Sequence, residues 1–585
     1  MDKRSLKLYA AGIGCLAAFA LSRTAPGADL LAVLDSGRGF SALLYTPGTT
    51  AIPPSTVLRI AAFLAGVLCF APAAAPLGRA ALRFVDLCRR ELGDWWVVGI
   101  LAVISGGLAV TLAFGPLGRE GHTPAEREYD FQARIFAAGR VTAELPATDK
   151  AGGAEAGNFV VGEGDGVAGG RWFAAAEPAG PLALAGGKAL GIGWLVNPLL
   201  GVITTFVLFG YGRRLFGADA ALVACLLYAA SPFAVFNNAS LFPEPAFLLL
   251  LLLSLWAVDA ARPSGKPVPW LVAGLVLGAA AAAQTLSALA AGIPVAAVVA
   301  YDTFRHRLTW RSPACFALGL IIGITPLLLY NYVTSGDFFR FPTAYRVASS
   351  AGVGEMALFS IRRLWVAATD FAGWPLISFA PMLFPFLIKQ IPRQGRLLYA
   401  VAIATVCLYA FVPDAGVAYG ARLYYGVLPA ALVIGGWGLI KLPAYLADKR
   451  GSRPGTAAAA LTLALLAGTV PYFIRVTPVY SDYRAFPDGA RPWVTPYLSR
   501  ALEEWDVRSA IVFIAPAERC PGPAPNDIGP GNGVIFARDR GRPNAEFAAL
   551  FAPRPYILCD YGEFEKTGVL RILKLEPARR AGKGE

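Results

Sequence analysis

Three acidic residues, Glu126, Glu128 and Asp130, lie within five positions of the stretch TPAEREYDFQARIFAAGR at residues 123–140. A carboxylate within hydrogen-bond reach of a hydroxyl group can take its proton while the oxygen attacks an electrophilic carbon. The residue types and their spacing are therefore compatible with general base catalysis. The same residue types also form ordinary helix surface, so their chemistry depends on the elements that position them.

Each acid also has a local structural explanation. Thr123, Pro124 and Glu126 fit a helix N-terminal capping box with proline at the first helical position. Asp130 precedes Arg134 by four residues, which is the spacing of an ion pair along a helix. The sequence thus predicts a capped helix, and it leaves open whether Glu126 caps this helix, catalyses a reaction, or does both.

The helical period places these side chains on different faces. At about 100° per residue, Glu126 shares a face with Tyr129 and Gln132, whereas Asp130 points away from them. Glu128 lies one turn from Gln132. An amphipathic helix of this kind can lie at a membrane interface and hold one acid over the bilayer.

The composition is that of a membrane protein. Of 585 residues, 56% are hydrophobic and 16% are charged, and the mean hydropathy is +0.53, whereas soluble domains have about 25% charged residues. Apolar runs of about 17–22 residues, long enough to cross a hydrocarbon core as a helix, recur about thirteen times. They cover roughly residues 5–22, 56–75, 95–114, 190–211, 217–236, 242–260, 268–283, 286–302, 314–332, 374–389, 397–412, 424–446 and 456–475. The predicted fold class is a polytopic α-helical membrane protein.

Basic residues gather between alternate apolar runs and so fall on one side of the predicted membrane, which the positive-inside rule assigns to the cytoplasm. The clusters are Lys3, Arg4 and Lys7; Arg83, Arg89 and Arg90; Arg213 and Arg214; Arg262 and Lys266; Arg305, Arg307 and Arg311; Lys389, Arg393 and Arg396; and Lys449, Arg450 and Arg453. The N-terminus is then cytoplasmic, whereas residues 115–189, 333–373 and 413–423 and the tail from residue 476 lie outside. Much of the net charge of +13 belongs to these clusters, and no nucleic-acid partner is expected.

Four regions follow from this topology. They are N-terminal transmembrane helices at 1–114, an external loop with amphipathic helices and the candidate acids at 115–189, a transmembrane core at 190–475, and an external C-terminal domain at 476–585. In the tail, the runs SAIVFIA, GVIFARD, PYILCDY and VLRILKL are typical of β-strands, and turn-rich segments separate them. The tail is therefore predicted to be a small, separate α/β domain.

Cysteine and histidine usage argues against a zinc or haem centre. The chain has two histidines and no CxxC or HExxH motif, so no cofactor is assigned, although the use of a divalent metal stays open. Cys520 and Cys559 both lie in the external tail, where a disulfide is chemically permitted. Two unconnected thiols are the alternative.

The stretch EREYDFQARIFAAGRV resembles the first external loop of a bacterial group of GT-C glycosyltransferases, which are integral membrane enzymes related to protein O-mannosyltransferases and the lipid A aminoarabinose transferase. Further segments resemble the same group in the same order. They are GRWFAAAEPAGPLALAGGKALGIGWLVNPLLG, YAASPFAVFNNASLFPEP, GITPLLLYNYVTSGDFFRFP, YGARLYYGVLPAAL and, in the tail, NDIGPGNGVIFARDRGRPNAEFAALF. The resemblance implies a GT-C-like fold in the bacterial inner membrane, with the loop and the tail in the periplasm.

In that family a loop carboxylate takes the proton of an acceptor hydroxyl, which attacks a sugar carried on a polyprenyl phosphate, and the departing phosphate needs a cation. The resemblance thus implies sugar transfer from a polyprenyl-phosphate-linked donor to a periplasmic glycan, lipid or protein acceptor. It makes Glu126 the candidate base, with Glu128, Asp130 and Glu244 as substitutes, and Arg422 the candidate phosphate partner. The predicted substrate-binding residues are Tyr129, Gln132, Glu244, Arg340, Arg346, Arg422 and Tyr425.

Departures from the family pattern keep an alternative open. Ala125 stands where the group commonly has the first acid of an Asp-Glu pair, so only Glu126 remains, and Gln284-Thr285 stands where Arg-Pro is common. The alternative is a catalytically silent relative that binds a lipid-linked glycan or scaffolds envelope assembly. Arg422 has an alternative of its own as an interfacial anchor beside Tyr425. A transporter is less favoured, because few ionisable residues lie within the predicted spans.

Overall fold

The computed structural model groups the chain into two compact units. The helical unit consists of Met1–Gly118, Leu195–Thr325 and Ser350–Ser481, and the loop-and-tail unit consists of Arg119–Trp194, Pro326–Ser349 and Asp482–Glu585. The structure describes residues 10–11, 13–15, 17–18, 54–69, 75–145, 157–160, 165–168, 170–264, 266–341, 353–374, 377–412, 416–448, 454–481, 502–515, 526, 533–551, 554–560 and 571–577.

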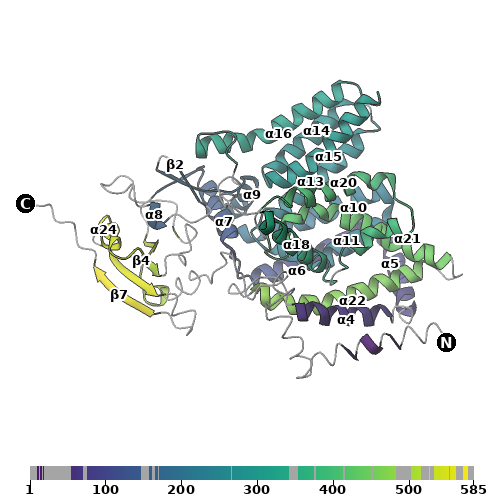
Figure 1. The fold of residues 1–585 in the computed structure, drawn as a ribbon, viewed down its shortest axis with the longest axis horizontal. Helices are drawn as coiled ribbons and strands as arrows, with labels where there is room; N and C mark the ends of the chain where they lie inside the picture. The colour runs from purple at the N-terminus through teal and green to yellow at the C-terminus, as the bar shows by residue number, and fades with distance from the viewer. Residues whose placement is uncertain are drawn as a thin grey trace, which may run out of the picture. The chain divides into compact units, whose positions relative to one another are not determined.

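Long apolar helices dominate the helical unit (Figure 1). Six helices of the described chain are long and apolar enough to cross a membrane: α6 (Asp94–Phe114), α10 (Val196–Phe216), α13 (Glu244–Ala261), α15 (Thr285–Phe304), α16 (Arg311–Ser335) and α22 (Pro454–Ser481). A seventh span results if α11 (Ala218–Ala230) and α12 (Pro232–Ala239), which meet at a 60° bend, count as one. These lengths agree with the predicted polytopic helical membrane protein.

Several other predicted spans correspond to helices of fewer than 18 residues. They are α4 (Pro54–Cys69), α14 (Pro267–Ala281), α19 (Ala380–Leu387), α20 (Arg396–Tyr409), and the succession of η4 (Arg422–Val427), η5 (Ala430–Ile434) and α21 (Gly435–Asp448). Proline limits helix length because it has no N–H to donate, and α19 contains both Pro381 and Pro385. The predicted run at 5–22 lies largely outside the described residues. The count of about thirteen spans therefore stays a prediction.

Helix α10 lies at the centre of the packing in the helical unit. It contacts α6, α11 and α13, while α11 also packs against α21, and α13 packs against α14. Helix α15 contacts α20, and α22 contacts α21, α4 and α5 (Ala75–Leu92). Helices α10 and α13 run side by side, and a polar cluster lies at each end of this pair.

Glycines allow α14 and α16 to approach closely. A Cβ atom on Gly274 would lie 2.0 Å from the carbonyl oxygen of Phe316, and one on Gly319 would lie 2.1 Å from the carbonyl oxygen of Leu271. Gly278 and Gly323 make equivalent contacts one turn further along. Each helix thus carries two glycines four residues apart, the small-residue spacing that brings transmembrane helices into backbone contact.

We expect Gly274→Ala to destabilise the helical unit by about 1–3 kcal/mol, because the added methyl group overpacks a backbone contact. The matched control is Gly107→Ala, where nothing lies within 4 Å of the added carbon. Alanine there should be neutral or stabilising, since it lowers the entropic cost of a helical glycine. Denaturant unfolding of the purified protein in detergent measures both, and equal effects of the two changes would contradict the packing argument.

The loop-and-tail unit contains α7 (Pro124–Ala137) and α9 (Ala179–Ala189), which pack against each other. Helix α7 also contacts an antiparallel sheet with strand order β1-β3-β2, formed by β1 (Ala143–Glu144), β2 (Asp165–Ala168) and β3 (Arg171–Ala174). Phe131 of α7 is fully buried against the ring of Trp172 in β3, with 4.8 Å between the ring centres. This aromatic contact fixes the face of α7 that turns inward.

The four tail runs predicted as strands form one sheet. Strands β4 (Ala510–Ala515), β5 (Val534–Arg538), β6 (Pro555–Asp560) and β7 (Arg571–Pro577) have the order β5-β4-β6-β7, and only the β6–β7 pair is antiparallel. Helix α24 (Pro543–Ala549) follows β5 along the chain. The described tail is therefore an α/β arrangement, as its alternating strand and turn segments predict.

Contacts within the loop-and-tail unit include some between the loop and the tail, and the predicted domain boundaries stay a prediction. Phe159 of α8 (Gly157–Val160) stacks on Phe547 of α24, with 4.4 Å between ring centres. An aromatic side chain in an otherwise Gly-rich loop thus packs onto the tail. Cys559 is a free, fully buried thiol whose pKa burial raises to about 12, and Cys520 lies outside the described residues, so their pairing stays untested.

Candidate functional site

The N-terminus of α7 is closed by a complete capping box. Thr123 Oγ1 accepts a hydrogen bond from the backbone N–H of Glu126 at 3.2 Å. In return, Glu126 Oε2 accepts from the backbone N–H of Thr123 at 3.0 Å, from the Thr123 hydroxyl at 3.1 Å and from the backbone N–H of His122 at 3.0 Å. The capping interpretation of Glu126 is confirmed.

Glu126 is fully buried, and a single carboxylate oxygen accepts those three hydrogen bonds. Its charge also lies at the positive end of the helix dipole, where an anion is stabilised. The hydrogen bonds hold the carboxylate in one orientation. This arrangement would suit a positioned base, and it would equally suit a purely structural cap.

Asp130 is engaged by two cations in the loop-and-tail unit. Its carboxylate lies 2.6 Å from Lys188 Nζ of α9 and 3.6 Å from Arg134 Nε. The predicted ion pair with Arg134 is confirmed, but Lys188 is the closer partner. The helical spacing around Asp130 does not predict Lys188 as a partner, because Lys188 belongs to another helix. Its one local signal is that it is the single charge in the apolar sequence of α9.

The other predicted residues of α7 are buried. Gln132 is fully buried and uses both ends of its amide: its nitrogen donates to the Val141 carbonyl at 2.9 Å and its oxygen accepts from the Ala174 N–H at 3.1 Å. Tyr129 and Glu128 are 2% and 9% exposed. Gln132 therefore ties α7 to the loop that follows it and to the end of β3.

A second polar cluster lies in the helical unit, at the start of α13. Glu244, the first residue of that helix, is fully buried, and its Oε1 lies 3.4 Å from Nη1 of Arg422, whose side chain is 11% exposed. The guanidinium group of Arg422 also lies over the ring of Phe242, 4.8 Å from its centre. The structure thus brings together two predicted site residues that are 178 positions apart. We call this group the Glu244–Arg422 cluster.

Residues of the segments that the sequence singled out help to build this cluster, and Asn197 is the clearest case. Its side-chain nitrogen donates to the carbonyl oxygens of Ser240 and Phe242, both at 2.7 Å, which fixes the segment that leads into Glu244. Asn197 belongs to the WLVNP letters at the start of α10. The sequence singled out this segment without assigning the asparagine a role.

A tight turn presents Arg422. The backbone N–H of Arg422 donates to the carbonyls of Gly416 and Gly420 at 3.1 and 2.9 Å. Gly420 has φ +102°, a conformation that side chains rarely adopt, and a Cβ there would lie 2.5 Å from the ring of Phe233. Tyr419 also has a positive φ, and its carbonyl oxygen accepts a hydrogen bond from the side-chain nitrogen of Asn237 in α12 at 3.3 Å. The turn is thereby held against α12.

Tyr425 lies in the same region and is fully buried beside Phe233. Its hydroxyl group has no hydrogen-bond partner among the described residues. A buried hydroxyl without a partner costs about 1–3 kcal/mol, so it is commonly satisfied by water or by a ligand. This position is therefore compatible with the predicted substrate-binding role.

The sequence missed Asp370, at the end of α18 (Val353–Asp370), because its partners lie far along the chain. Its carboxylate accepts hydrogen bonds from the hydroxyls of Tyr472 and of Tyr480, the latter at 3.1 Å. The Tyr480 ring packs against Tyr419, 5.5 Å between centres, which links this acid to the turn before Arg422. Asp370 is thus a further buried acid of the helical unit.

Two further predicted substrate-binding residues follow α16 in the sequence. Arg340 is exposed, and Arg346 lies outside the described residues. Arg363 of α18 is fully buried and donates to the Val412 carbonyl at 3.1 Å. In the described parts of the chain, no group of three or more His, Cys, Asp and Glu residues could hold a metal ion.

Comparison with known proteins decides the class of fold. The family described as dolichyl-phosphate-mannose-protein mannosyltransferase matches residues 179–330, which include Asn197 and Glu244. The chain is also similar to the crystal structure of ArnT from Cupriavidus metallidurans bound to undecaprenyl phosphate, with TM-score 0.52 and 13% identity over 81% of this chain and 95% of that one. The chain therefore shares the fold of this ArnT structure.

The likeness to ArnT holds for a second structure. ArnT from the same organism in the apo state matches with TM-score 0.52 and 13% identity, over 81% of this chain and 96% of that one. No curated protein matches the sequence. The predicted resemblance to GT-C glycosyltransferases is therefore confirmed, and the long apolar helices of the described chain agree with a membrane protein.

Proposed function

We propose that this GT-C chain transfers a sugar from a polyprenyl-phosphate-linked donor to a periplasmic glycan, lipid or protein acceptor at the bacterial inner membrane. The observation behind the proposal is the GT-C fold, which extends over 95% of an ArnT chain whose structure holds undecaprenyl phosphate. The N-terminus would be cytoplasmic, and the loop and tail periplasmic. We assign no cofactor, and a divalent metal stays open.

In this proposal, Arg422 is the partner of the donor's phosphate. It is a mostly buried guanidinium group whose fork of donors matches phosphate oxygens. Glu244 holds it in place, and the unpaired hydroxyl of Tyr425 would add a donor. Stabilising the departing phosphate in a buried site is worth more than the same interaction in water.

We propose Glu126 as the base that takes the acceptor proton, with Glu128, Asp130 and Glu244 as substitutes. Support comes from its fixed orientation at the N-terminus of α7. Asp130 is the weaker candidate, because Lys188 and Arg134 already neutralise it. Tyr129, Gln132, Arg340 and Arg346 keep their proposed substrate-binding roles, although the two amide bonds of Gln132 suggest that it acts by positioning α7.

One observation favours the alternative of a catalytically silent relative that binds a lipid-linked glycan or scaffolds envelope assembly. Three capping hydrogen bonds converge on one oxygen of Glu126, which explains the retention of this residue without any chemistry. A silent relative would still bind the lipid-linked sugar, so binding alone does not separate the two functions.

A transfer assay separates them. The full chain, reconstituted in lipid vesicles, is given a radiolabelled pool of polyprenyl-phosphate sugars and membrane acceptors, with Glu126→Gln, Glu128→Gln and Asp130→Asn alongside. We expect transfer by the wild type and by Asp130→Asn, whose position is structural. Absence of transfer by the wild type, with measurable binding of the labelled lipid, would establish the silent alternative. Transfer that survives all three changes would remove the assignment of the base and keep the enzyme.

A further inference from the structure

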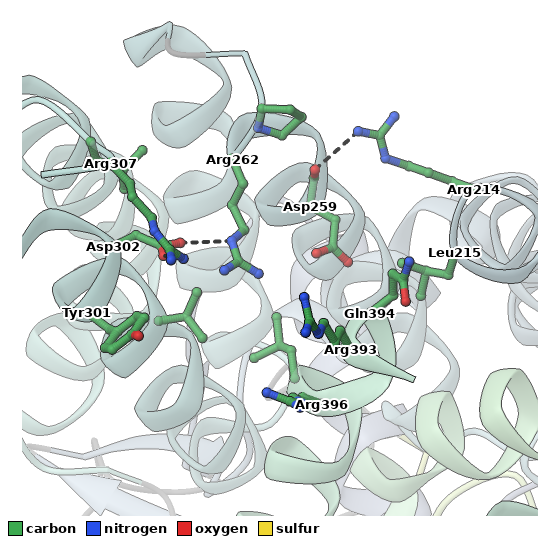
Figure 2. A pocket seen from close by; sticks show the side chains of 14 residues that line it. Arg214, Leu215, Asp259, Arg262, Tyr301, Asp302, Arg307, Arg393, Gln394 and Arg396 are labelled. Atoms are coloured by element: carbon green, nitrogen blue, oxygen red, sulfur yellow. Dashed lines mark hydrogen bonds and ion pairs between the residues drawn. The ribbon is translucent and has the colours of Figure 1, made fainter. Parts of the chain in front are cut away.

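The helical unit contains a basic pocket of about 950 Å³ at the opposite ends of the helices that build the Glu244–Arg422 cluster (Figure 2). Five arginines line it. Arg214 lies in the last turn of α10, Arg262 caps the C-terminus of α13, Arg307 follows α15, Arg393 lies in η3 (Arg393–Gly395) and Arg396 begins α20. Four separate parts of the chain thus converge on one cavity with the same charge.

Two aspartates hold part of this arginine group in place. Asp302, whose side chain is 4% exposed, accepts from Arg262 Nε at 2.8 Å and lies 3.4 Å from Arg307 Nη1. Asp259 is held by the hydroxyl of buried Tyr211 at 2.8 Å, and its backbone carbonyl accepts from Arg214 at 3.2 Å. Figure 2 shows these pairs on the upper side of the pocket. The arginines are therefore oriented before any ligand binds.

The remaining two arginines have no such neutralisation. Among the described residues, neither Arg393 nor Arg396 has an ion-pair partner, and five arginines face only two carboxylates in the pocket. Figure 2 shows Arg393 pointing toward the space below Arg262. Arg393 and Arg396 are exposed to solvent, and like charges that converge in this way attract anions. The positive-inside rule explains basic residues at these helix ends, but not their convergence on one cavity.

The position and the lining of the pocket indicate what the anion is attached to. Helix α13 begins at Glu244 and has 18 residues, so it rises about 27 Å, close to the thickness of a hydrocarbon core. The pocket thus lies at the membrane face opposite to Glu244, on the side that the sequence predicts to be cytoplasmic. Leu215, Val298 and Leu397 form an apolar part of its wall. A ligand that is both anionic and partly apolar fits this combination.

We propose that this pocket binds the phosphate groups of an anionic phospholipid from the predicted cytoplasmic leaflet. The excess of arginines favours a lipid with two phosphates, of the cardiolipin type, over one with a single phosphate. Guanidinium groups bind phosphate oxygens through two parallel hydrogen bonds, and basic pockets between transmembrane helices are suited to such headgroups. The site is independent of the transfer reaction and lies at the opposite end of α13 from Glu244.

The test uses the full chain, purified in detergent, stripped of lipid and titrated with cardiolipin, phosphatidylglycerol or phosphatidylcholine while bound lipid is counted by native mass spectrometry. We expect cardiolipin to bind at least tenfold more tightly than phosphatidylcholine. Arg393→Gln with Arg396→Gln should weaken cardiolipin binding at least tenfold. The matched control is Arg213→Gln, which removes an exposed arginine in the last turn of α10 that does not line the pocket, and it should leave binding within twofold.

Each other outcome contradicts the proposal in a defined way. Equal weakening by Arg213→Gln would mean that the basic collar attracts anionic lipid without a site. Equal binding of phosphatidylcholine would exclude recognition of the phosphate charge. Inorganic phosphate is the remaining arm, and if it displaces cardiolipin at equal concentration, the pocket is a site for a soluble phosphate. Thermal unfolding without lipid checks that the variants are folded alike. Arg213, Arg393 and Arg396 are exposed, so their substitution should leave the fold intact.

Discussion

Replacing Glu126 by glutamine is expected to lower the rate of sugar transfer by about 10²–10⁴-fold, the usual contribution of a positioned general base. Glutamine can take the place of glutamate in a capping box, since its amide oxygen still accepts from the backbone N–H of Thr123. It cannot accept the proton of an acceptor hydroxyl. The measurement is initial transfer rate per folded protein, with thermal unfolding recorded for the same samples.

The matched control for this substitution is Thr123→Ala. It removes the hydroxyl that accepts from the Glu126 N–H, which should destabilise α7 by about 0.5–2 kcal/mol, and it leaves the carboxylate in place. Transfer by folded Thr123→Ala should stay near that of the wild type. If Glu126→Gln transfers at the wild-type rate while Thr123→Ala unfolds more easily, Glu126 is a cap and the base lies elsewhere.

The second large effect is expected at the Glu244–Arg422 cluster. Arg422→Met removes the cation that lies against a fully buried carboxylate, and breaking a buried ion pair in this way should destabilise the protein by about 3–5 kcal/mol. Binding of the polyprenyl-phosphate donor and transfer should be lost in the same variant. Denaturant unfolding and a donor-binding assay measure the two effects separately.

A double substitution distinguishes a phosphate partner from a structural ion pair. Glu244→Gln together with Arg422→Met removes both charges, so no uncompensated charge is left buried and most of the stability should return. Donor binding should not return, because no guanidinium group is present. A double variant that is stable and transfers sugar at the wild-type rate would show that the pair serves the fold alone.

Features with local causes could be predicted from the sequence. The capping box from Thr123 to Glu126, the ion pair of Asp130 with Arg134 and the strand segments of the tail all depend on residues a few positions apart. Helical and strand geometry make such spacings interpretable without knowledge of the rest of the chain. The apolar runs predicted the helical membrane class for the same reason, since their length alone indicates the ability to span a bilayer.

The sequence predicts conformation less well where packing partners elsewhere in the chain outweigh the local pattern. The run at 424–446 is continuously apolar, but the chain divides it into η4, η5 and α21, so its length alone was a poor guide to its conformation. Phe159 lies in a Gly-rich segment with no local signal for a partner, and its ring stacks on Phe547 of the tail in the structure. In both cases packing partners elsewhere in the chain outweigh the local pattern.

The pairing of the polar groups depends on the tertiary structure. Lys188 reaches Asp130 from another helix, Arg422 meets Glu244 across 178 positions, and Asn197 holds the segment before Glu244 from the start of α10. No periodicity within one segment encodes these contacts. They exist because a buried charge or amide must find a partner, and the folded chain, rather than the neighbouring sequence, determines which partner lies within hydrogen-bond distance.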